Sequence, residues 1–149
     1  MQAAGCATFE VSGRCLCGAV TYKAKAASHD VSVCHCGMCR RWTGGPLMYF
    51  DVEGAPSFTG QSDIGLYRSS ATGERGFCKR CGSVLFWKVA GEDRYTFTAG
   101  SLDATTGLIL AKEIFIEDKP AFYDFANPTE KLYGSQAMSV YTGSGDEPK

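Results

Sequence analysis

Eight cysteines are the residues of this 149-residue chain best suited to chemistry, and seven of them fall into three short groups. The groups are the pair Cys15 and Cys17, the triplet Cys34, Cys36 and Cys39, and the pair Cys78 and Cys81. A hydrophobic core does not need thiols at such local density. Closely spaced cysteines in a protein with reduced thiols are more often metal ligands or catalysts than disulfides.

The two pairs together supply four thiolates, which is the complete ligand set of a structural zinc site. Cys15, Cys17, Cys78 and Cys81 are therefore predicted to hold a zinc ion. Gly82 follows the second pair, at a position where such a turn needs a positive φ. Because the pairs are far apart in sequence, the metal would join the start of the fold to its middle and restrict the unfolded chain.

The triplet supplies three ligands, and a zinc site with three protein ligands keeps a position for water or substrate. Three thiolates leave the metal little Lewis acidity, but they suit a soft ligand such as a substrate thiol, which would be held as the nucleophilic thiolate. Arg40 and Arg41 follow the triplet and either balance its charge or hold a substrate carboxylate, or they form a solvated basic turn. His35 could be a fourth ligand, but its side chain should point away from the metal if the backbone is extended.

Composition places the chain among ordinary globular domains. Net charge is −1, 44% of the residues are hydrophobic and 21% are charged. The near-neutral charge and the lack of a basic aromatic stripe argue against nucleic-acid binding. We find no signal-peptide pattern and no apolar run of membrane-spanning length, so we expect a cytoplasmic protein with no membrane partner. A secreted disulfide scaffold is the alternative, and the Cys-x-Cys spacing argues against it.

Short alternating segments separated by glycine-rich turns predict a mainly β protein. Strands are expected at residues 8–11, 19–23, 31–33, 47–52, 57–59, 64–68, 84–89, 94–99 and 111–116. A turn is expected at 53–56, a helical turn begins at Met38, and no segment shows sustained helical periodicity. We expect an N-terminal arm at 1–12 that contains the lone Cys6, a single zinc-binding β domain at 13–134, and a mobile tail at 135–149.

Four motifs carry a resemblance to a known family. They are GRCLCGAV at 13–20, the CHC of the triplet with Cys39 and Arg40, FCKRCGS at 77–83 and GSLD at 100–103. In this order, from about residue 13 to residue 125, the chain resembles the glutathione-dependent formaldehyde-activating enzyme family, which also contains centromere protein V.

The resemblance implies an Mss4-like fold of tent-shaped antiparallel sheets clipped by a zinc site. It also implies two zinc ions, one structural at the two pairs and one catalytic at the triplet. The named reaction of the family adds glutathione to formaldehyde and gives S-hydroxymethylglutathione, so the implied class is a carbon–sulfur lyase of the S-(hydroxymethyl)glutathione synthase type. Its partners are a small thiol and a small aldehyde.

On this reading, a thiolate held at the triplet attacks the aldehyde carbon. Ser101 in the GSLD motif is a candidate donor to the alkoxide, with a plain turn residue as the alternative, and Arg40 is a candidate for a glutathione carboxylate. Two rival functions stay open: a lyase of the same family with another thiol substrate, and a zinc-stabilised binding module without catalysis. A binding module has no need of a metal with a vacant position.

Overall fold

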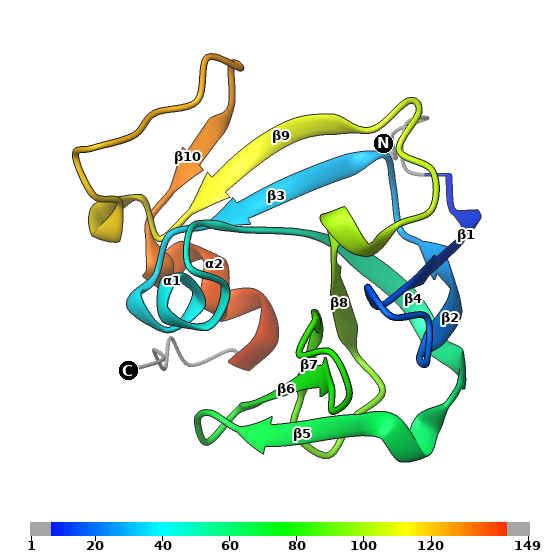
Figure 1. Ribbon diagram of the computed structural model, residues 1–149. Coiled ribbons are helices and arrows are strands. Elements are labelled where there is room, and N and C mark those ends of the chain that lie inside the picture. The colour runs from blue at the N-terminus through cyan, green and yellow to red at the C-terminus, as the bar shows by residue number, and fades with distance from the viewer. Residues whose placement is uncertain (1–6, 143–149) are drawn as a thin grey trace.

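A computed structural model describes residues 7–142, which form ten strands in one mixed sheet (Figure 1). The strand order is β10-β9-β3-β4-β8-β7-β6-β5, and β2 branches from β4 and carries β1. The strands are β1 (Phe9–Arg14), β2 (Thr21–Ala26), β3 (Asp30–Cys34), β4 (Leu47–Thr59), β5 (Ile64–Arg68), β6 (Gly73–Cys78), β7 (Val84–Val89), β8 (Tyr95–Thr98), β9 (Ile109–Ile114) and β10 (Glu130–Leu132). The α-helices are α1 (Gly37–Thr43) and α2 (Gly134–Thr142), and 3-10 turns span Gln61–Asp63, Ala99–Ser101 and Ile116–Asp118.

The mainly β prediction is confirmed, but the sheet is not wholly antiparallel. Strand β9 runs parallel to both β3 and β10. Parallel neighbours need a long crossover connection, and here β4 to β8 separate β3 from β9, while residues 115–129 separate β9 from β10. The alternation of apolar and polar residues within a strand does not show whether the neighbouring strand is parallel or antiparallel. The parallel pairing of β9 therefore could not be predicted from the sequence.

Strand β4 connects the two halves of the sheet. Its first residues pair with β3 and β8, and its later residues pair with β2. The turn predicted at 53–56 is wrong, because the strand continues through it with a register shift opposite Lys23 and Lys25. Gly54 has a φ of 70°, and Pro56 cannot donate a backbone hydrogen bond. These residues produce a bulge where the sequence predicted a turn.

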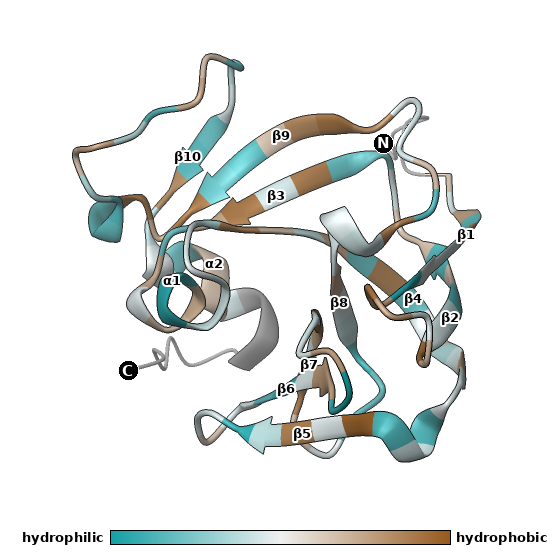
Figure 2. Ribbon diagram, viewed as in Figure 1, coloured by the Kyte–Doolittle hydropathy of each residue, from teal (hydrophilic) through white to brown (hydrophobic). Residues whose placement is uncertain are grey.

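Two hydrophobic clusters lie on opposite faces of β4. Successive strand residues point to opposite faces, so Phe50 packs in a cluster with Tyr22, Leu85 and Phe97, whereas Tyr49 packs with the cysteine triplet. The same alternation appears along β3 in the hydropathy of its residues (Figure 2). The triplet is therefore part of a packed core and does not stand on a free loop.

The two predicted terminal segments contain regular structure. Strand β1 begins at Phe9 inside the expected arm and pairs with β2, and Cys6 lies outside the described residues. Helix α2 occupies residues 134–142 of the region expected to be a mobile tail, and 143–149 lie outside the described residues. Buried Ala137 and Met138 pack this helix against the triplet's cluster. Because the rest of the tail is mostly polar, these apolar residues did not lead to the prediction of a helix.

The start of α2 is fitted closely to the turn that follows β9. A side chain at Gly134 would meet the Phe115 ring, with Cε1 2.2 Å from the position of its Cβ, so the helix can approach only because this residue is glycine. The Gly134 N–H donates to the Glu117 carboxylate, which stabilises the positive end of the helix. None of the helices in the described part of the chain has the length and apolar character needed to cross a membrane.

Candidate active site and metal centres

The first cysteine cluster joins the end of β1 to the end of β6. Sulfur atoms of Cys15, Cys17, Cys78 and Cys81 all lie within 4.8 Å of one another, so these four residues could hold a metal ion. Two of the sulfurs also accept backbone N–H bonds, from Val20 to Cys15 and from Arg80 to Cys78, each at 3.3 Å.

Two turns shape this cluster. Gly18 and Gly82 have φ values of 84° and 81°, so the positive φ predicted at Gly82 is confirmed. The hydroxyl of Ser83 lies 3.2 Å from the Cys81 sulfur and lowers the pKa of that thiol to about 5. Cys15 and Cys78 are buried, which suits a site that contributes to folding.

The triplet lies where β3 runs into α1. Cys34 ends β3, Cys36 caps the N-terminus of α1, and Cys39 lies in its first turn. Their sulfurs also lie within 4.8 Å of one another, and all three residues are buried. The predicted helical turn is confirmed, and it ends at Gly44, which has the left-handed conformation typical of a helix C-terminus.

The backbone and the neighbouring thiols favour negative charge at the middle cysteine. The Cys39 N–H donates to the Cys36 sulfur at 3.4 Å. Hydrogen bonds from the Cys34 and Cys39 thiols, with help from the Arg75 charge, lower the pKa of Cys36 to about 3. The same sharing raises the pKa of Cys34. Three buried sulfurs that compete for one negative charge form a donor set that a soft cation would complete.

His35 points away from the triplet, as its position between two cysteines predicted. Its side chain is fully buried, with Nε2 2.8 Å from a Glu113 oxygen and Nδ1 2.7 Å from the Tyr123 hydroxyl. Thr129 donates to the other Glu113 oxygen at 2.6 Å. The His35 backbone N–H also donates to Ile114, so β3 is fixed to β9 directly behind the cysteines. This network holds the backbone that presents Cys34 and Cys36.

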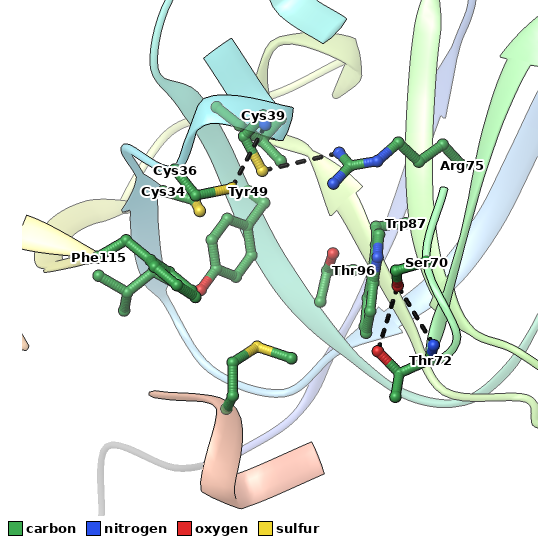
Figure 3. Close-up of a pocket in the computed structure, with 13 residues that line it drawn as sticks. Cys34, Cys36, Cys39, Tyr49, Ser70, Thr72, Arg75, Trp87, Thr96 and Phe115 are labelled. Carbon is green, nitrogen blue, oxygen red and sulfur yellow. Dashed lines mark hydrogen bonds between the residues drawn. The ribbon is translucent and has the colours of Figure 1, made fainter. Parts of the chain in front are cut away.

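A cavity of about 60 Å³ opens beside the triplet (Figure 3). Its aromatic walls are Tyr49 on β4, Trp87 on β7 and Phe115 in the turn after β9. Its polar groups are Arg75 on β6, Thr96 on β8, and Ser70 and Thr72 in the loop before β6. Helix α2 contributes Met138. Among the described residues, Phe115 is the only non-glycine with a positive φ, at 55°. Such backbone strain persists only where the surrounding structure imposes it, and it is often found at functional sites.

Arg75 is the residue of this site that the sequence did not reveal. It lies on β6 with 4% of its surface exposed, and its Nη1 donates to the Cys39 sulfur at 3.6 Å. Its Nε donates to Ser69 at 3.0 Å, and its guanidinium lies 5.0 Å from the centre of the Trp42 ring. Only the strand register brings it here, because β6 crosses from the four-cysteine cluster to the triplet. No local spacing could have indicated that.

The two residues predicted to contact substrate have different positions. Arg40 is on α1 and half-buried, and its Nε donates to the His35 carbonyl at 2.9 Å. Ser101 is not at the triplet. It lines a separate cavity of about 570 Å³ near Cys15 and bonds to the Tyr22 hydroxyl and the Thr98 carbonyl. These contacts place Ser101 away from the triplet and fit the alternative of a structural turn residue.

The chain is similar to known proteins in sequence and in fold. The family model described as "Glutathione-dependent formaldehyde-activating enzyme" matches residues 10–118. An uncharacterized lyase of Schizosaccharomyces pombe is 35% identical over 130 residues, which cover 87% of this chain and 95% of that protein. A crystal structure of a Rhodobacter sphaeroides protein superposes with a TM-score of 0.52 over 62% of this chain and 88% of that one. At 23% identity this last likeness concerns the fold alone.

Proposed function

Because the chain belongs to the glutathione-dependent formaldehyde-activating enzyme family, we propose that it is a carbon–sulfur lyase that joins a thiol to a small aldehyde. Glutathione and formaldehyde are the leading pair. The observation that carries the proposal is the set of three buried cysteine sulfurs that open into a small cavity. A binding module would not need buried thiols beside an internal cavity.

Both cysteine clusters fit zinc, since zinc prefers thiolate ligands and neither cluster includes a hard oxygen donor. Cys15, Cys17, Cys78 and Cys81 would hold a structural ion, and Cys34, Cys36 and Cys39 would hold a catalytic one. When bound at the triplet, zinc supplies a position at which an incoming thiol is kept as its thiolate.

The residues of the chain supply confinement and orientation for this reaction. Tyr49, Trp87 and Phe115 form apolar walls that limit the access of water to the thiolate and the aldehyde. The substrate sulfur adds to the aldehyde carbon, the carbonyl electron pair moves to the oxygen, and a proton from solvent completes the hydroxyl group. A cavity of about 60 Å³ can hold formaldehyde but not a tripeptide, so the peptide part of glutathione must lie outside it.

Arg40 is proposed to bind a carboxylate of the thiol substrate. It follows Cys39 on α1, and within residues 7–142 its side-chain hydrogen bond uses Nε alone, which donates to the His35 carbonyl. Charge-assisted hydrogen bonds of this kind contribute about 1.5–3 kcal/mol each. Substituting Arg40 with Gln should therefore raise the KM for glutathione by about tenfold or more and leave the KM for a thiol without carboxylates nearly unchanged.

The direct test is to follow hemithioacetal formation from glutathione and formaldehyde with zinc-loaded wild type and with Cys36→Ser. We expect wild type to accelerate the spontaneous reaction and the variant to do so far less. A wild-type rate equal to the spontaneous rate would refute the formaldehyde assignment. The assay would then be repeated with other thiols and aldehydes. Acceleration with another pair would indicate a lyase with a different substrate, and no acceleration with any pair would indicate a binding module without catalysis.

A further inference from the structure

Arg75 carries a buried positive charge that no carboxylate of the described residues pairs with. The ion pairs within residues 7–142 involve other cations, and none joins Arg75 to Asp or Glu. A buried charge is costly unless an opposite charge lies nearby. The negative charge beside Arg75 is that of the triplet, through the contact with Cys39. A cation so placed in a cavity can also bind an anion that develops during a reaction.

The guanidinium is held in one orientation from three sides. Nε is bonded to Ser69, Nη1 to Cys39, and Cζ lies over the Trp42 ring, 5.0 Å from its centre. Within residues 7–142 its hydrogen bonds use only Nε and Nη1, which leaves Nη2 for a ligand. Figure 3 shows the guanidinium directed from β6 toward the triplet, above Thr96 and Trp87.

We propose that Arg75 is a catalytic residue that binds the aldehyde oxygen and stabilises the alkoxide formed when the thiol adds. This inference rests on the proposed function. As the carbon–sulfur bond forms, the carbonyl π bond breaks and its electron pair moves to the oxygen beside Nη2. Arginine stays protonated in proteins, so it stabilises charge and does not supply the proton, which comes from water. In the reverse direction the alkoxide reforms the carbonyl and expels the thiolate.

The alternative is that Arg75 only balances the charge of the cysteine sulfurs. Removing the charge of Arg75 would impair activity in either case. Only a residue that binds the aldehyde oxygen should also bind a small oxygen anion in the cavity. Formate is a suitable probe, because it places negatively charged oxygens on a single carbon and is small enough for the cavity. The chain has two tryptophans, Trp42 beneath Arg75 and Trp87 in the cavity wall, so intrinsic fluorescence should report formate binding at this site.

The experiment compares wild type, Arg75→Gln, Arg75→Lys and the control Arg94→Gln, which changes an exposed arginine between β7 and β8. Three quantities are measured: zinc bound per chain, formate affinity by fluorescence, and kcat at saturating thiol. We expect Arg75→Gln to keep its zinc, to bind formate at least about tenfold more weakly, and to lose about 10²–10³-fold in kcat. Lysine keeps the charge without the planar fork, so about a tenfold loss in kcat is expected there.

The proposal is overturned if Arg75→Gln binds formate as wild type does, or if added zinc restores its kcat in full. Should Arg75→Gln fail to fold, Arg75→Lys carries the test, and wild-type values for both formate affinity and kcat would overturn the proposal. Failure of the proposed function has a different signature. Wild type would then not accelerate the thiol–aldehyde reaction at all, while formate affinity would still report whether Arg75 binds an oxygen anion.

Discussion

The buried pair of His35 and Glu113 should show strong energetic coupling. Glu113→Leu removes the acceptor for His35 Nε2 and for the Thr129 hydroxyl, and the Glu113 side chain is only 2% exposed. Each buried polar group left without a partner costs about 1–3 kcal/mol, and this change leaves two such groups, His35 Nε2 and the Thr129 hydroxyl. We expect Glu113→Leu to lower the free energy of unfolding by about 2–6 kcal/mol.

Removing both partners should cost less than the two single losses together. His35→Phe alone leaves the Glu113 carboxylate buried beside Thr129 and the half-exposed Lys131. The double variant replaces the pair by apolar groups, and such a replacement is often close to neutral. The double-mutant cycle should therefore give a favourable coupling energy of about 2 kcal/mol or more.

The assay is urea unfolding followed by tryptophan fluorescence, with the free zinc concentration fixed because metal binding shifts apparent stability. Glu130→Leu makes the same change at an exposed position on β10 and should alter stability by less than about 0.5 kcal/mol. Additive losses in the cycle, or a Glu113→Leu loss no larger than that of the control, would refute the role assigned to this network.

Three further predictions concern the metal sites and the helix over the cavity. Cys78→Ser should prevent stable folding, because zinc binding at a four-cysteine site contributes folding free energy of about 10 kcal/mol, and a variant with full metal content and cooperative unfolding would contradict this. A chelator should remove one metal from wild type early with the fold intact by circular dichroism; simultaneous loss of both metals with unfolding would show that the two sites do not differ. Met138→Ala should widen the cavity and raise kcat/KM for aldehydes larger than formaldehyde relative to formaldehyde, as competition assays would measure, and an unchanged ratio would mean that α2 does not limit substrate size.

The sequence was sufficient to predict the features that depend on local spacing. The triplet, the positive φ at Gly82, the helical turn and the outward direction of His35 all follow from residues close together in the chain. The four-cysteine cluster was predictable because two matching pairs complete one ligand set, although the pairs are far apart in sequence. Most strands were also predictable, because alternation of side chains needs only the local pattern. Pro56 misled the prediction, since a bulge in β4 uses the same residues as a turn.

Features that depend on strand register were out of reach. Nothing in the local sequence around Arg75 relates it to the triplet, and only the pairing of β6 with β7 directs it there. Ser101 looked suitable by its motif but is bonded to Tyr22 beside another cavity. Helix α2 was missed because the few apolar residues of so short a segment, set in a polar tail, carry too little periodicity to predict a helix.

The central claim is that the cysteine triplet accepts a substrate thiol, whereas the four-cysteine cluster is closed. Titrating cobalt-loaded protein with glutathione while recording sulfur-to-cobalt charge-transfer absorption tests it most directly. We predict new absorption that saturates at about one thiol per chain in wild type and is absent in Cys36→Ser, which keeps the four-cysteine cluster. An unchanged wild-type spectrum, or the same change in Cys36→Ser, would contradict the account.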